Sequence, residues 1–158
     1  GWFIEDVDSR FHTKLYANTN TELAFYNLIN YPDGSLITSS NDLGKYLVEL
    51  ISGYNENGLL LSKKSYKELF TPKLNDTTHK DRSNNTYNDE YNMGVFMGMS
   101  AKEQIGHTGG DPGITTLMFF NSKTNIGKIL LTNTDLDNEG IKKLNAIWKK
   151  LEEFENKL

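Results

Sequence analysis

A chain of 158 residues is long enough for one domain with a buried core. Its 37% hydrophobic and 24% charged residues exclude an intrinsically disordered chain. The net charge of -4 argues against a surface that neutralises phosphates, so no nucleic-acid partner is expected. The sequence has no cysteine, which excludes disulfides, thiol nucleophiles and cysteine-ligated zinc. It also has no apolar run near the roughly 20 residues that span a bilayer.

The first 34 residues carry few regular signals. The chain begins Gly1-Trp2-Phe3-Ile4, without an initiator methionine or a signal peptide, so we expect a processed start or a piece of a longer protein. Apolar residues recur over residues 1–30 without a sustained period, which predicts an irregular segment with short extended pieces. A Tyr-Pro-Asp-Gly turn follows at residues 31–34.

Two helices are predicted next. Ser39 or Ser40 can cap the first, Gly53 is expected to end it, and one face carries its apolar stripe: Leu43, Tyr46, Leu47, Leu50 and Ile51. The second should start after Ser62 and end before Pro72, with Tyr66, Leu69 and Phe70 buried.

The second half of the chain predicts a sheet and a final helix. Residues 73–90 form a polar loop, and residues 91–99 and 104–107 have strand character. A hairpin is expected from residues 115–121 and 126–132. The last helix should start near Asn138, with its apolar residues on one face: Ile141, Leu144, Ile147, Trp148, Leu151 and Phe154. Helices, then an antiparallel sheet, then a covering C-terminal helix make an α+β fold.

The stretch His107-Thr108-Gly109-Gly110 is the strongest functional signal. Glycine lets another molecule approach the backbone, whose N–H groups can stabilise an oxyanion. A hydroxyl and a titratable ring beside it can bind a carboxylate or move a proton. The alternative is a glycine-rich turn with an incidental histidine, and these four residues alone favour that alternative.

The surrounding sequence resembles the serine β-lactamase and penicillin-binding protein superfamily. Its third active-site motif, K-T-G, is H-T-G in several branches and runs on as H-T-G-G-x-P-G into an apolar strand, as residues 107–113 do here. Residues 31–47, YPDGSLITSSNDLGKYL, are similar to a family segment in which a turn leads into a capped helix. The resemblance covers about residues 31–155 and lies in the branch of class C β-lactamases, D-alanyl-D-alanine carboxypeptidases and esterases.

The nucleophile motif of that superfamily is missing. No serine of the chain has a lysine three positions later, so S-x-x-K does not occur. The sequence Tyr16-Ala17-Asn18 matches the second motif, Y-x-N, but lies only 15 positions before Tyr31, so we interpret it as accidental. The whole chain, 1–158, is therefore interpreted as the C-terminal portion of a β-lactamase-like domain, inactive by itself.

The resemblance implies roles for four residues. Gly110 would supply the second oxyanion donor from its N–H, and His107 would shape the local charge. Thr108 and Gly109 would bind a substrate carboxylate or carbonyl. The implied parent is a bacterial, periplasmic or extracellular serine hydrolase that transfers an acyl group from an amide, a β-lactam or an ester. No cofactor and no metal are expected.

Two other readings remain open. The parent could be a catalytically silent binder of peptides or cell-wall fragments, or the chain could be a self-sufficient interaction domain that shares only the scaffold.

Asp135-x-Asp137-x-Glu139-Gly140 has the opening of a calcium loop, but Ala146 stands where its closing glutamate belongs. Acidic residues near a helix start explain it better. His12 and His79 have no partner histidine at ligand spacing.

The chain is also expected to self-associate. In the family fold other strands pair beside the strand resembling residues 126–132. Without them its open edge would recruit a second copy, or residues 1–30 would fold back over it.

Overall fold

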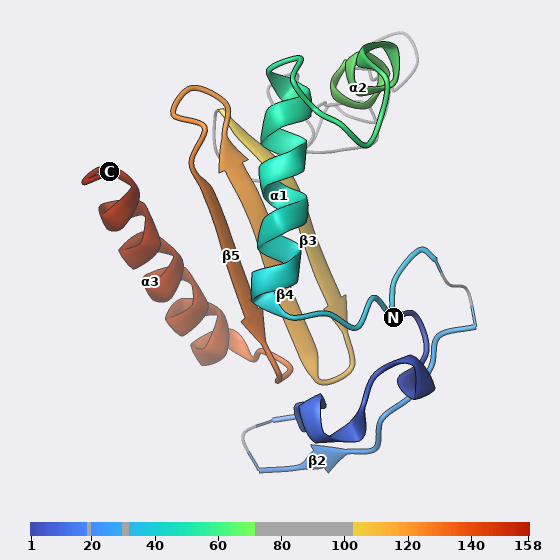
Figure 1. Cartoon of the computed structure of the whole chain (residues 1–158). Coiled ribbons are helices and arrows are strands. Elements are labelled where there is room, and N and C mark those ends of the chain that lie inside the picture. The colour runs from blue at the N-terminus through green and yellow to red at the C-terminus, as the bar shows by residue number, and fades with distance from the viewer. Residues whose placement is uncertain (19, 30–31, 72–102) are drawn as a thin grey trace, which may run out of the picture. The chain divides into compact units, whose positions relative to one another are not determined.

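The computed structural model describes residues 1–18, 20–29, 32–71 and 103–158. The elements in chain order are η1 (Ile4–Asp6), η2 (Ser9–Phe11), β1 (Leu15–Tyr16), β2 (Glu22–Leu23), α1 (Ser40–Tyr54), α2 (Lys63–Phe70), β3 (Gln104–Asp111), β4 (Ile114–Asn121), β5 (Gly127–Thr132) and α3 (Asn138–Glu155). The predicted α+β class is confirmed (Figure 1). The polar loop 73–90 and the strand 91–99 lie outside the described residues.

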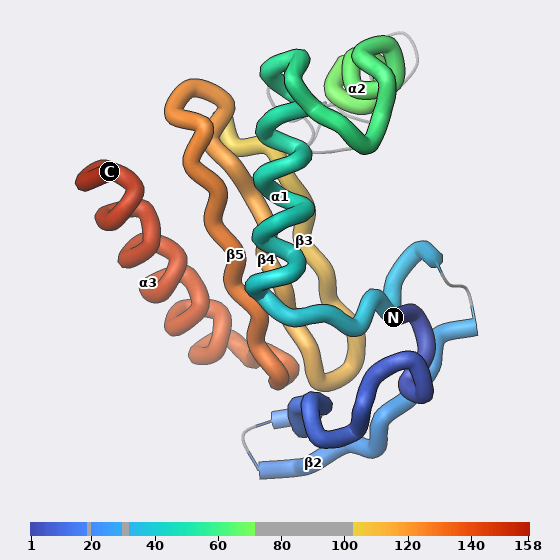
Figure 2. The backbone as a smooth tube through the Cα atoms, in the orientation of Figure 1, coloured from blue at the N-terminus to red at the C-terminus, as the bar shows by residue number. Residues whose placement is uncertain are grey.

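Three strands form the larger sheet, in the order β3-β4-β5. Only Pro112 and Gly113 separate β3 from β4, and a short turn separates β4 from β5, so neighbouring strands run antiparallel (Figure 2). The predicted hairpin is confirmed, but β3 is longer than expected. The sequence indicated an extended piece only over residues 104–107, whereas the strand continues through the glycines to Asp111.

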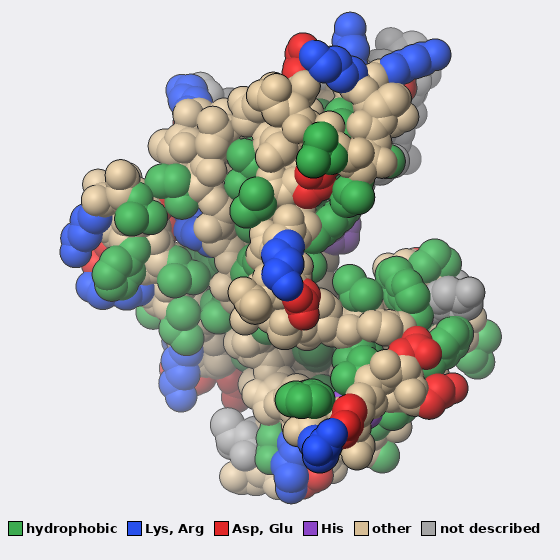
Figure 3. Space-filling view, in the orientation of Figure 1, with side chains coloured by type: hydrophobic (Ala, Val, Ile, Leu, Met, Phe, Trp, Pro, Cys, Tyr) green, Lys and Arg blue, Asp and Glu red, His purple; other side chains and the backbone are tan. Residues whose placement is uncertain are grey.

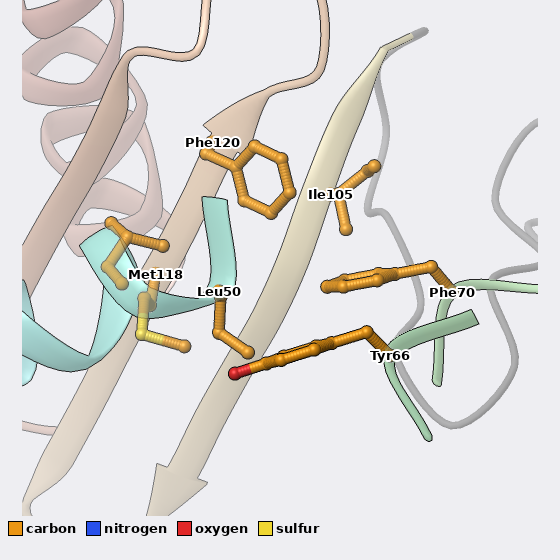
Figure 4. Packing of buried hydrophobic residues seen from close by; sticks show 7 residues of the cluster. Leu50, Tyr66, Phe70, Ile105, Met118 and Phe120 are labelled. Atoms are coloured by element: carbon orange, nitrogen blue, oxygen red, sulfur yellow. The ribbon is translucent and has the colours of Figure 1, made fainter. Parts of the chain in front are cut away.

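The chain divides into two compact units, one of residues 1–42, 109–116 and 130–158, the other of residues 43–108 and 117–129. The second unit holds the core, in which α1 and α2 pack on β3 and β4 (Figure 4). Its buried members are Leu47, Leu50, Tyr66, Phe70, Ile105, Met118 and Phe120. Phe70 and Tyr54 each meet Phe120 edge-on, with ring centroids 6.3 and 5.6 Å away.

Helix α1 has a capped start and a tight end. The hydroxyl of Ser39 accepts the Asp42 N–H at 3.1 Å, which confirms Ser39 as the cap. Beyond Tyr54 the chain turns at Glu56, a non-glycine residue at φ 63°, whose N–H reaches back to the Gly53 carbonyl. The prediction that Gly53 ends the helix is wrong, because α1 runs past it to Tyr54.

Gly53 instead makes room for an aromatic ring. A β-carbon there would lie 2.2 Å from Tyr66 Cε1, and one on Gly58 would lie 2.4 Å from Tyr66 Cε2. Tyr66 therefore lies in a slot between two glycines. Helix α2 starts after Ser62 as predicted, and the Ser62 hydroxyl caps it by accepting the Ser65 N–H at 3.1 Å.

The first unit begins with the expected irregular segment, made of two 3-10 turns and the short antiparallel pair β1–β2. Tyr16 joins this segment to the chain just after β5. Its N–H donates to the Asn133 carbonyl at 3.1 Å, and its carbonyl accepts the Asp135 N–H at 2.9 Å. These hydrogen bonds lie beyond Thr132, so in the described part of the chain they do not occupy the edge of β5.

Helix α3 begins where the sequence predicted, with the Asp137 carboxylate accepting the Gly140 N–H at 2.7 Å. None of its residues is buried. Its apolar stripe is half-buried or exposed: Ile141, Leu144, Ile147, Trp148, Leu151 and Phe154. Among the described helices, none combines the length and the hydropathy that a membrane-spanning segment requires.

Candidate functional site

All four predicted site residues lie consecutively on β3. The strand is buried at Ile105 and reaches the surface at His107, after which Thr108 is half-buried and Gly109 and Gly110 are exposed. Among the described strands, β3 forms one edge of its sheet. The stretch is therefore an exposed segment of strand, and the alternative of a glycine-rich turn is wrong for residues 107–110.

The glycines of β3 differ in what surrounds them. A β-carbon on Gly106 would lie 2.0 Å from the Met118 carbonyl oxygen and 2.7 Å from Phe119 Cα, so the packing of β3 on β4 requires glycine there. A β-carbon on Gly110 would meet nothing within 4 Å. The described fold gives no steric reason for glycine at position 110, and the missing side chain leaves the backbone open to approach.

Gly109 is intermediate between these two cases. Its β-carbon would lie 2.6 Å from the hydroxyl oxygen of Thr116 on β4. That hydroxyl donates to the Gly109 carbonyl at 3.4 Å. Gly109 therefore has a local packing role, and its carbonyl already has a partner within the sheet.

His107 has a defined tautomer if its ring is neutral. Its Nδ1 is hydrogen-bonded to the Thr108 carbonyl oxygen. Because a carbonyl can only accept, Nδ1 must carry the proton, and Nε2 is then the accepting nitrogen. An exposed ring of this kind can accept a hydrogen bond or a proton through Nε2.

Two residues from distant segments, Tyr26 and Asp135, hold the turn after the site in place. Gly113, at φ 78°, donates its N–H to Asp135 Oδ1 at 2.8 Å, and Tyr26 donates its hydroxyl to the Pro112 carbonyl at 2.8 Å. Burial, helped by the carboxylates of Asp111 and Asp135, raises the pKa of Tyr26 and keeps it a donor. The Pro-Gly pair was the one sequence signal for this turn, and its two anchors come from distant segments.

Tyr16 and Asn18, which belong to the Y-x-N match, make contacts within the N-terminal segment and to the chain after β5. Tyr16 is the residue that bonds to Asn133 and Asp135. Asn18 Oδ1 accepts the N–H groups of Asn20 and Thr21, both at 2.9 Å, which shapes the link between β1 and β2. The interpretation of this match as accidental stays a prediction, because Tyr16 makes these contacts through its backbone.

The acidic residues that resemble a calcium loop also have structural partners, since Asp135 binds the Gly113 N–H and Asp137 caps α3. Across the part of the chain that the structure describes, no cluster of three or more His, Asp or Glu could hold a metal ion. The His12 ring packs against Phe25 in a tilted arrangement with ring centroids 4.8 Å apart, and His79 lies outside the described residues.

The fold and the site define an α+β domain in which one strand of a hairpin carries an exposed histidine, a half-buried threonine and two exposed glycines. The Beta-lactamase family model matches residues 4–151. The chain belongs to the β-lactamase family, within the superfamily of serine β-lactamases and penicillin-binding proteins that the sequence resembles. Searches of curated proteins and of solved structures found no match.

Proposed function

We propose that this chain is the C-terminal part of a serine hydrolase that acts by acyl transfer on an amide, a β-lactam or an ester. We place the parent in the branch of class C β-lactamases, D-alanyl-D-alanine carboxypeptidases and esterases, because H-T-G replaces K-T-G. The observation that carries the proposal is the open space at Gly110, where a β-carbon would meet nothing within 4 Å. A strand that receives a substrate carbonyl needs such a gap.

In this proposal the reaction is attack of a serine on the carbonyl, an acyl-enzyme, and release by water. The N–H of Gly110 is the second oxyanion donor, which acts where negative charge develops in the transition state. The Thr108 hydroxyl hydrogen-bonds a substrate carboxylate or carbonyl, beside the exposed Gly109. His107 shapes the local charge of the site from its exposed position on the strand.

The nucleophile has to come from outside these 158 residues. No serine here begins an S-x-x-K motif, so this chain supplies the oxyanion and substrate-binding strand and a preceding segment would supply the serine and its lysine. A parent that lacked both motifs would bind peptides or cell-wall fragments without turnover.

The test is turnover by the longer protein with Gly110→Val, on a chromogenic cephalosporin, a D-Ala-D-Ala peptide and a simple ester. We expect turnover of at least one substrate by the unmodified protein and a loss of about 10²–10³-fold in the variant, as for removal of an oxyanion donor. The melting temperature of both proteins checks that the fold is kept. Near-normal turnover by a folded Gly110→Val protein contradicts the role of Gly110, and no turnover by the unmodified protein favours the silent binder.

A further inference from the structure

Three consecutive leucines form an exposed apolar loop between α1 and α2. Leu59, Leu60 and Leu61, called the leucine tip below, are 89%, 68% and 46% exposed. Isolated exposed leucines are common on proteins. A run of three consecutive exposed apolar residues lowers solubility and marks an interaction surface.

The structure holds this loop in place. Glu49 Oε1 on α1 accepts the Leu60 N–H at 2.8 Å and also the Leu59 N–H, which fixes the backbone of the tip. The same oxygen accepts the hydroxyl of the buried Tyr66. The first residue after the tip is Ser62, which caps α2. The leucine side chains are therefore held outward by satisfied hydrogen bonds on both sides.

Basic residues follow the tip directly. Residues 57–67 contain Lys63, Lys64 and Lys67 and no acidic residue, although the whole chain has a net charge of -4. All three lysines are exposed, and lysine side chains gather over α2 (Figure 3). Lys63 lies 3.7 Å from Glu56, but both side chains are at least 75% exposed. An ion pair this exposed is weak, so Lys63 can leave Glu56 and bind another anion.

We propose that the leucine tip and the three lysines dock this unit on an anionic lipid surface. Leucines that enter the headgroup region with lysines around them are the combination used by interfacial anchors. Protein partners fit this surface less well, because lysine is depleted at protein interfaces and leucine is under-represented among their hot spots.

The test is binding of the full chain to vesicles of phosphatidylcholine alone and of phosphatidylcholine with 30% phosphatidylglycerol, by flotation at low salt. We expect binding to the anionic vesicles only, weakened by salt. Lys63→Gln/Lys64→Gln/Lys67→Gln should lower the partition coefficient by roughly 100-fold, since each lysine near an anionic surface contributes about fivefold. Binding to neither vesicle, or equally to both, overturns the proposal.

A matched pair of variants separates the tip from the other exposed apolar surface. Leu59→Ser/Leu60→Ser should lower the partition coefficient at least about tenfold. Ile147→Ser/Phe154→Ser on α3, where the two side chains are 47% and 55% exposed, should leave it unchanged. The opposite result assigns binding to α3 and overturns the proposal.

A third measurement keeps Leu59 and Leu61 and replaces only Leu60. Because the chain has no cysteine, Leu60→Cys and the control Leu158→Cys can each be labelled with one environment-sensitive dye. We expect anionic vesicles to blue-shift the dye at position 60 and to leave the dye at position 158 unchanged. An unchanged spectrum at position 60 with vesicle-bound protein overturns insertion of the tip.

Discussion

The hydroxyl of Tyr66 on α2 donates a hydrogen bond to Glu49 Oε1 on α1 at 2.5 Å. The same oxygen accepts two backbone N–H groups of the loop between the helices. The pKa of Glu49 is lowered mainly by the hydrogen bond from Tyr66 and, to a lesser extent, by the hydrogen bonds from the loop backbone. The pKa of Tyr66 is raised mainly by burial and, to a lesser extent, by the hydrogen bond to Glu49 and the negative charge of Glu49.

The first prediction concerns the pH dependence of stability. A carboxyl whose pKa is lowered on folding stabilises the fold above its ordinary pKa, about 4.5, and loses this effect as the pH falls through the folded value. Glu49→Gln should therefore lower Tm by several degrees near pH 7, and the difference from the unmodified protein should shrink below about pH 4.5.

Tyr66→Phe is the companion variant for the first prediction. A tyrosine whose pKa is raised on folding favours the folded state up to its ordinary pKa, about 10, and loses this effect as the pH rises beyond it. The variant should flatten the alkaline limb of a Tm–pH curve, and Glu49→Gln should flatten the acid limb. Curves that stay parallel to that of the unmodified protein at both ends would show that this contact has no energetic role.

The second prediction compares two glycines of α1. Gly53→Ala should destabilise by about 1–3 kcal/mol, because its β-carbon would lie 2.2 Å from Tyr66 Cε1 in a packed slot. Gly44→Ala, whose β-carbon has only Ile129 Cδ1 at 4.0 Å, should stabilise by about 0.5–1 kcal/mol through helix propensity. Urea unfolding measures both, and equal effects at the two positions would refute the slot.

Much of the fold was predictable because local signals and packing agree. Capping and periodicity predict the serine cap of α1, the start of α2 after Ser62, the hairpin β4–β5 and the start of α3. Gly53 was misread because a glycine near a helix end usually marks a stop, and the Tyr66 ring that needs it comes from another element. The length of β3 was missed because glycine disfavours strands, and pairing with β4 overrides that preference.

The candidate site was predictable as a motif but not as a structure. Residues 107–110 could be selected by resemblance, whereas their exposure and the different surroundings of Gly106 and Gly110 depend on β4. The turn anchors Tyr26 and Asp135 carry no local signal, because they reach Pro112 and Gly113 from 86 and 22 positions away.

The third prediction separates the glycines of β3 by stability. Gly106→Ala should destabilise by about 3 kcal/mol, because its β-carbon meets backbone atoms of β4 that cannot rotate away. Gly110→Ala should change stability by less than about 1 kcal/mol, because its β-carbon meets nothing within 4 Å. Thermal unfolding of both variants is the measurement, and a strongly destabilised Gly110→Ala protein would show that glycine 110 serves packing.

The fourth prediction is that this chain alone forms no acyl-enzyme, because it has no S-x-x-K serine to attack a carbonyl. A fluorescent penicillin, followed by denaturing electrophoresis and intact-mass spectrometry, should leave the mass unchanged. A serine β-lactamase or penicillin-binding protein with an intact S-x-x-K motif is the positive control. A covalent adduct on any serine of this chain would overturn the prediction.

The fifth prediction is that the chain self-associates. Among the described strands β5 ends the sheet, and an edge strand presents unpaired backbone groups that a second chain can pair with. The N-terminal segment bonds to Asn133 and Asp135 and does not occupy that edge within the described residues. Helix α3 adds exposed apolar surface, including Ile147 and Phe154.

Light scattering from about 5 to 200 µM should therefore show a concentration-dependent rise in mass for the unmodified chain. Hydrogen exchange at residues 127–132 should slow over the same range, because strand pairing protects edge amides. Ile147→Glu/Phe154→Glu should shift the rise to higher concentration if α3 shares the interface, and leave it in place if the strand edge alone suffices. A monomer at every concentration, with edge amides that exchange at a constant fast rate, would contradict self-association through β5.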